Sequence, residues 1–204
     1  MSELAEGRAG GTPQVIAALE QRRVAHDELL TKLTVAGGAG AIEQSAALIA
    51  ESLAGGGKSI FFGNGGSAAD AEHIAAELVG RFRVDRRPLA ALSLGANLAI
   101  ASALANDFGY EQAFARELEA IASPGDVAIA ITTSGRSPNV VEALAKARGL
   151  GLRTVALTGR GHQLDDLADQ LVVVESENVA LIQEMHAVVG HIICELVESR
   201  LGVV

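Results

Sequence analysis

GDVAIAITTSGRSPNVVEAL, residues 125–144, places an apolar segment, a hydroxyl-rich loop and a helical pattern directly after one another. The segment from Val127 to Ile131 is wholly apolar, which is typical of a strand buried on both faces of a parallel sheet. Ser137 to Ala147 then shows the apolar spacing of a helix. A strand that passes through a short polar loop into a helix is the repeating unit of α/β domains.

The same unit recurs on both sides of this stretch. Short apolar segments predict further strands at residues 59–62, 89–94, 154–158 and 171–175. Helical spacing predicts helices at residues 67–82, 97–105, 110–122, 163–168 and 178–201. We therefore predict an α/β fold, a single five-stranded parallel sheet sandwiched by helices in a flavodoxin-like or Rossmann-like arrangement.

The N-terminal part has a different pattern. Residues 1–12 are mostly small or polar and lack periodicity, so we expect them to be disordered. Helices predicted at 13–33 and 41–54 precede the first strand. They indicate a helical hairpin within residues 13–57 that packs on a neighbouring subunit or caps the domain, and the whole domain is expected to span 13–204.

Composition narrows the classes of function. The net charge of -9 and the pI of about 5.0 argue against general binding to nucleic acid or acidic membranes. We interpret most of the arginines in residues 81–87 as a solvated loop. A single cysteine, Cys194, excludes a disulfide within the chain. With no secretory signal pattern and no apolar run of about 18 residues, we expect a cytoplasmic protein.

A glycine loop follows the first predicted strand, where ligands of parallel sheets bind. Gly65 and Gly66 allow a ligand to approach the main chain closely, and Asn64 and Ser67 add side-chain donors. Ser67 is also a candidate N-cap of the next helix. The motif is neither GxGxxG nor a P-loop, which disfavours dinucleotides and nucleotide hydrolysis. A tight strand-to-helix turn without a ligand is the alternative.

A second loop, after the predicted central strand, repeats this chemistry. Its hydroxyls belong to Thr132, Thr133, Ser134 and Ser137. Hydroxyls and main-chain amides at a helix start suit a phosphate monoester. The alternative is ordinary helix capping by Ser134 or Ser137.

Two predicted helices carry possible metal ligands. His73 and Glu77 are four residues apart and share one helix face, as a metal site or as a surface pair. Gln183 and His191 are eight apart on the C-terminal helix, a rise of about 12 Å. One ion contacts both only from between them, unless a neighbouring subunit supplies one ligand. His186 is a competing candidate, although an isolated histidine in an apolar helix is more often structural.

Several segments together resemble the sugar isomerase (SIS) domain family, and within it the phosphoheptose isomerases. They are GNGGSAADAEHIAAELVGRF, ALANDFGYEQAF, GDVAIAITTSGRSPNVVEAL, TVALTG and IQEMHAVVGHI, which cover most of residues 58–195. The resemblance implies a homotetramer with active sites between subunits and one zinc ion per subunit. It implies the metal ligands His73, Glu77, Gln183 and His191. It implies substrate contacts from Asn64, Gly65, Gly66, Asn106, Asp107, Thr132, Thr133, Ser134 and Ser137, to which Glu77 and Gln183 are added.

The activity implied by the resemblance is aldose–ketose isomerisation of sedoheptulose 7-phosphate to D-glycero-D-manno-heptose 7-phosphate. Glu77 would be the base and His191 the acid, while the hydroxyl loop would hold the phosphate. The Asn106-Asp107 pair, taken alone, fits a helix end as well as a sugar contact.

The chain departs from the usual family pattern in places, which keeps an isomerase of another phosphosugar as an alternative. The departures are Asn97, Thr132, Val179, Leu181 and the stretch TGRGHQ at 158–163. A second alternative is a non-catalytic regulator similar to the SIS protein that associates with the replication initiator DnaA. That relative lacks the carboxylate and the histidine that stand here as Glu77 and His191.

Overall fold

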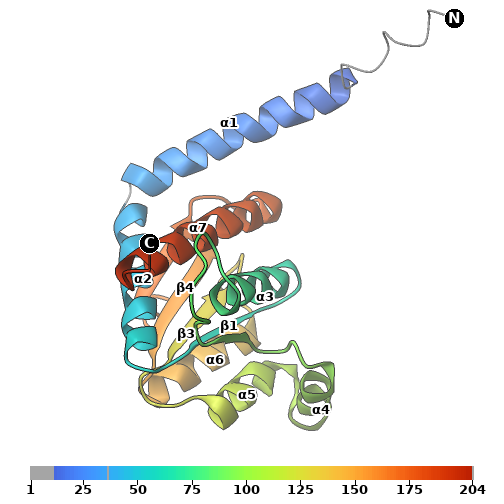
Figure 1. The fold of residues 1–204 in the computed structure, drawn as a ribbon. Helices are drawn as coiled ribbons and strands as arrows, with labels where there is room; N and C mark the ends of the chain where they lie inside the picture. The colour runs from blue at the N-terminus through green and yellow to red at the C-terminus, as the bar shows by residue number, and fades with distance from the viewer. Residues whose placement is uncertain (1–11, 36, 204) are drawn as a thin grey trace, which may run out of the picture.

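The computed structural model describes residues 12–35 and 37–203, and its centre is a five-stranded parallel sheet (Figure 1). The strand order is β2-β1-β3-β4-β5. The strands are β1 (Ser59–Gly63), β2 (Ala91–Ser93), β3 (Val127–Ile131), β4 (Arg153–Gly159) and β5 (Gln170–Val174). All four neighbouring pairs are parallel, which confirms the predicted fold class.

Helices cover both faces of the sheet. The helices of the described residues are α1 (Pro13–Val35), α2 (Gly38–Ala54), α3 (Gly66–Val79), α4 (Leu98–Phe108), α5 (Ala113–Ile121), α6 (Pro138–Gly149) and α7 (Val179–Arg200), with a 3-10 turn at Tyr110–Gln112. Successive strand residues point to opposite faces, so Ile129 packs with α2, α3 and α7, while Ala128 and Ala130 pack with α5 and α6. Every residue of β1 and β3 is buried, as their continuous apolar sequences predict.

Two predicted elements are wrong. Residues 163–168 form no helix, because only one turn closes there, through main-chain bonds from Leu167 and Ala168 to Leu164. A lone turn fixes several dihedrals for few hydrogen bonds and does not propagate. The N-terminal helices also do not form a hairpin, because α1 and α2 are bent by 73° and α1 extends away from the sheet (Figure 1). Residues 1–11, most of the segment predicted to be disordered, lie outside the described residues.

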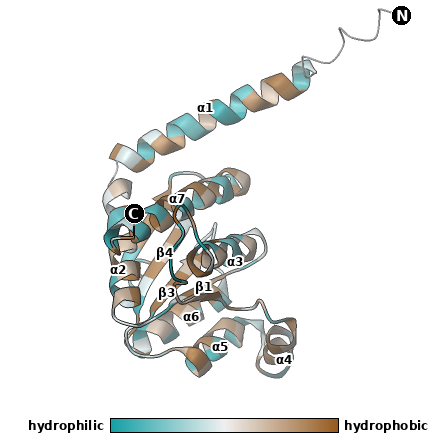
Figure 2. Ribbon diagram, viewed as in Figure 1, coloured by the Kyte–Doolittle hydropathy of each residue, from teal (hydrophilic) through white to brown (hydrophobic). Residues whose placement is uncertain are grey.

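Exposed apolar side chains are most numerous on two helices, α1 and α4. On α1 they include Val15, Ile16 and Leu19, each at least 50% exposed. Helix α4 is apolar along most of its length in Figure 2, yet none of its residues is buried. Exposed apolar surface of this extent is typical of a surface that another protein covers.

Helix α7 is long and apolar enough to cross a membrane by length and composition alone, as is the bent pair of α1 and α2. Polar residues such as Glu184 and His186 interrupt α7, so it is not the continuous apolar run that the sequence analysis looked for. In the folded domain α7 packs against α2 and α3, and Val189 and Val197 are fully buried in the core. A core helix satisfies the same criteria as a membrane span.

His186 lies on the buried face of α7 and is 1% exposed. Burial lowers its pKa from 6.5 to about 4, and the nearby main-chain carbonyl of Thr158 opposes this only in part. The folded chain therefore takes up this proton at lower pH than the unfolded chain, so stability is lost as pH falls from 6.5 towards 4. Between pH 7 and 5 the loss amounts to about 2 kcal/mol.

Denaturant unfolding at pH 7 and pH 5 tests this expectation, with His186→Leu as the comparison. The leucine variant should lose less stability between the two pH values, because it has no imidazole to protonate in the unfolded state. An equal loss in both proteins would show that other groups account for the acid sensitivity.

Candidate functional site

The glycine loop connects β1 to the start of α3, at the carboxyl edge of the sheet. Gly65 is the N-cap residue with φ of 58°, a conformation that favours glycine, and α3 begins at Gly66. A Cβ atom on Gly66 would overlap the side-chain amide of Gln183 on α7, so a larger residue here would displace that amide. Ser67 is therefore not the N-cap, and its side chain is buried inside the first helical turn.

Asn64 ties this loop to two other parts of the chain. Its side chain exchanges two hydrogen bonds with the amide of Asn139, at 2.9 and 2.8 Å. Its Oδ1 atom also accepts a 2.8 Å hydrogen bond from the hydroxyl of Tyr110. These contacts use both polar atoms of the Asn64 side chain, so they hold Asn64 and the glycine loop in one position. The sequence reasoning missed Asn139 and Tyr110.

The hydroxyl loop follows β3 and shares the same edge of the sheet. The Thr132 hydroxyl accepts a 3.2 Å hydrogen bond from the N–H of Gly135, and the Ser134 hydroxyl accepts one of 3.2 Å from the N–H of Arg136. Gly135 has φ of 61°. Thr132 is buried and Ser134 is exposed, so the first shapes the loop while the second faces outward.

The other two hydroxyls of this loop lie at its middle and its end. Thr133 is half-buried, and its main-chain carbonyl accepts from the N–H of Gly159 on β4. Ser137 is the N-cap residue of α6 but makes no side-chain capping bond, which leaves its hydroxyl for a ligand. Free N–H groups at this helix start add to the attraction for an anion.

Three of the four predicted metal ligands come together between α3 and α7. The Nε2 atoms of His73 and His191 are 2.8 Å apart, and the Glu77 carboxylate is 3.7 Å from His73 Nε2. All three ligand atoms lie within 4.8 Å of one another. Ligand atoms around tetrahedral zinc are about 3.3 Å apart, so small side-chain movements would let these three groups bind one ion. The pairing with His191 distinguishes this group from a simple surface pair.

Gln183 lies elsewhere on α7, with its amide against Gly66 of the glycine loop. His191 meets His73 two helical turns further along both helices. This position of Gln183 supports the expectation that a single α7 helix cannot easily present both Gln183 and His191 to the same ion. His186 is buried in the core and does not belong to the cluster.

Asn106 and Asp107 occupy the last turn of α4, and Asn106 donates a 2.8 Å hydrogen bond to Asp107. Both are exposed. They do not end the helix, since Phe108 is still helical and Gly109 is the C-cap. The following residue, Tyr110, contacts Asn64, so the end of α4 is tied to the glycine loop.

Asp70 is a further acidic group that the sequence reasoning missed. It lies on α3 one turn before His73, and its Oδ2 atom is buried without a hydrogen-bond partner among the described residues. Burial raises its pKa, and the charge of His73 opposes the shift. Its spacing of three residues from His73 was the available signal, because such residues share a helix face.

Comparison with known proteins gives a consistent result. The chain matches the SIS domain family over residues 9–159. It is 56% identical over 150 residues to a phosphoheptose isomerase of Paramagnetospirillum magneticum, covering 73% of this chain and 78% of the relative. It is 53% identical over 155 residues to that of Aquifex aeolicus, covering 76% and 81%. The structure is similar to that of the phosphoheptose isomerase from Neisseria gonorrhoeae, with a TM-score of 0.82, 34% identity and coverage of 91% and 97%.

Proposed function

The chain belongs to the phosphoheptose isomerase family of SIS-domain proteins, and from this membership we propose that it converts sedoheptulose 7-phosphate to D-glycero-D-manno-heptose 7-phosphate. It is thus an aldose–ketose isomerase that acts on a sugar phosphate. The single observation in the structure that carries the proposal is the meeting of His73, Glu77 and His191 between α3 and α7. A carboxylate and an imidazole there supply the acid and base that this reaction needs.

In the proposed mechanism Glu77 removes a proton from carbon 1 of the ketose. His191 donates a proton to the oxygen on carbon 2, which gives an enediol. A proton is then returned to carbon 2 while the hydroxyl on carbon 1 loses its own, which leaves the aldehyde. Overall one proton moves from carbon to carbon and one from oxygen to oxygen, so no redox cofactor is required.

The substrate contacts follow from the two loops. The phosphate is assigned to the hydroxyl loop, where Ser134 and Ser137 offer hydroxyls at the start of α6. The glycine loop supplies main-chain groups near the sugar, from Gly65, Gly66 and Ser67. Asn64 holds this loop in place. Thr132 and Thr133 shape the hydroxyl loop. Asn106 and Asp107 are exposed and are assigned to sugar hydroxyls.

We also propose a zinc ion held by His73, Glu77, His191 and Gln183. Two imidazoles, an amide and a carboxylate suit zinc and several other divalent ions. When bound, zinc would polarise the sugar carbonyl as a Lewis acid. Because Gln183 lies two helical turns from His191, a neighbouring subunit is the proposed source of this fourth ligand.

A homotetramer with active sites between subunits is part of the proposal. The exposed apolar side chains of α1 and α4 offer the surface that such an assembly would cover. We also place the enzyme in the cytoplasm. Burial raises the pKa of its one cysteine, Cys194, to about 12, which suits an unreactive core thiol in a reducing compartment.

The similarity to phosphoheptose isomerases disfavours both alternatives from the sequence, the non-catalytic regulator and an isomerase of another phosphosugar. Glu77 and His191 favour an enzyme, because a scaffold that only binds another protein does not need a carboxylate and an imidazole in contact with His73. Leu181 and Val179, at the start of α7, are the positions where substrate choice is most open.

Turnover of sedoheptulose 7-phosphate by the purified chain tests the proposal, with chelator, with added zinc and with His191→Ala. We expect heptose 7-phosphate to form, chelation to abolish its formation and zinc to restore it, because the ion would polarise the carbonyl. The His191→Ala variant should stay inactive with zinc present. Turnover that survives both chelation and the substitution would contradict the proposed site. A metal-loaded tetramer without turnover would point to another phosphosugar.

A further inference from the structure

Phe82 lies on the segment between α3 and β2 and packs on the ring of His191. The two ring centroids are 5.3 Å apart and the planes are inclined by 28°, which is a stacked arrangement. On another side the His73 ring meets His191 edge-on, with centroids 5.0 Å apart. His191 is therefore held between an aromatic ring from the segment and an imidazole from α3.

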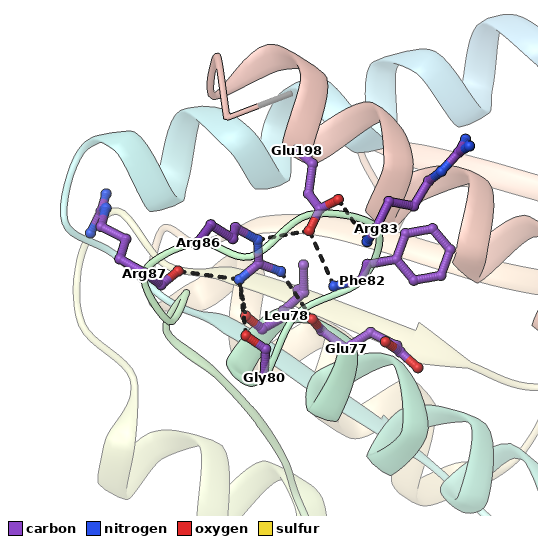
Figure 3. A network of polar contacts seen from close by, with 8 residues as sticks. All are labelled: Glu77, Leu78, Gly80, Phe82, Arg83, Arg86, Arg87 and Glu198. Atoms are coloured by element: carbon purple, nitrogen blue, oxygen red, sulfur yellow. Dashed lines mark hydrogen bonds and ion pairs between the residues drawn. The ribbon is translucent and has the colours of Figure 1, made fainter.

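A buried carboxylate keeps Phe82 in this place. Glu198, on α7, accepts hydrogen bonds from the N–H groups of Phe82 and Arg83, at 3.2 and 3.0 Å (Figure 3). It also pairs with the guanidinium of Arg86 at 2.8 Å, and the side chains of Glu198 and Arg86 are only 0% and 2% exposed. Burial alone would raise the pKa of Glu198, but the three donors outweigh it and the pKa is lowered.

The guanidinium of Arg86 also binds the end of α3. It donates to the main-chain carbonyls of Glu77 and Leu78, at 3.0 and 2.9 Å (Figure 3). These carbonyls have no partner within the helix end, so the guanidinium caps it. Arg86 and Glu198 together connect the helix that carries His73 and Glu77 to the helix that carries His191.

We propose that Phe82 is a positioning residue that fixes the ring orientation of His191, and that the Arg86–Glu198 pair holds Phe82 in place. The inference rests on the proposed function only in taking His191 as a metal ligand and acid. An imidazole that rotates freely must be ordered each time it binds an ion or a sugar. Groups that orient a ligating histidine commonly contribute 10- to 100-fold to metal affinity.

Phe82→Leu tests the proposal, since leucine stays apolar but cannot stack and leaves Arg86 and Glu198 unchanged. One readout is the NMR signals of the His191 ring in metal-free protein, and the other is zinc affinity by calorimetry. We expect the ring signals to move and zinc affinity to fall about tenfold. Phe82→Tyr should retain both properties. In the reaction, Phe82→Leu should lower kcat more than it changes KM.

Glu195→Gln is the matched control, because it breaks the exposed ion pair between Arg83 and α7 and leaves the stacked rings alone. It should match the parent protein in both readouts. Unchanged His191 signals in Phe82→Leu would overturn the stacking, and unchanged zinc affinity with moved signals would overturn the positioning role. Neither readout uses the sugar, so the role of Phe82 is decided even if sedoheptulose 7-phosphate is not turned over.

Discussion

Glu77→Gln should lower kcat by about 10²- to 10⁴-fold, the usual contribution of a general base. The amide has nearly the same shape as the carboxylate but cannot accept the proton from carbon 1. Glutamine still offers an oxygen to a metal ion, so measurement at saturating zinc separates the loss of the base from weaker metal binding. The readout is incorporation of deuterium from heavy water at carbons 1 and 2 of the sugar, together with product formation.

Glu72→Gln is the matched control for this substitution. Glu72 is an exposed carboxylate on the same helix, so its loss changes the net charge equally and leaves the cluster intact. It should retain nearly full activity. If Glu77→Gln exchanged deuterium at the rate of the parent enzyme, Glu77 would be only a ligand and another group would be the base.

The strands of the sheet could be predicted from the sequence, because a strand that is buried on both faces has a continuous apolar sequence. Strands β1 and β3 are fully buried, and both appear in the sequence as short apolar runs bounded by polar turns. The carboxyl ends of parallel strands meet at one edge, so the glycine and hydroxyl loops could be placed near each other. The bend between α1 and α2 has no such signature, because helical spacing fixes each helix but not the angle between them.

The contacts that organise the site could not be predicted, because they join residues that are far apart in the chain. Asn64 binds Asn139 and Tyr110, which are 75 and 46 residues away, and no spacing rule reaches that far. The resemblance to the SIS domain family predicted that His73 and His191 share a site, whereas helical spacing did not. Gln183 lies against Gly66, a contact that its eight-residue separation from His191 did not predict.

Arg86 is the clearest exception to the expectation of a solvated arginine loop. Its neighbour Arg83 follows that expectation, with a side chain 60% exposed and an exposed partner in Glu195. Arg86 is only 2% exposed, because the segment folds over α7 and brings it to Glu198. Glu198 itself lies inside an apolar helical pattern. A single carboxylate in such a pattern does not predict which residue it will pair with.

Arg86→Met should destabilise the folded chain by about 3–5 kcal/mol, because it leaves the Glu198 carboxylate buried without its counter-charge. It also removes the donors that cap the end of α3. Arg83→Met, which breaks only an exposed pair, should cost less than about 1 kcal/mol. Denaturant unfolding near pH 7 measures both values. The double variant Arg86→Met with Glu198→Leu should recover part of the loss, since no unpaired charge then remains in the core. Equal destabilisation by Arg86→Met and Arg83→Met would mean that the pair is solvated in the protein and does not link α3 to α7.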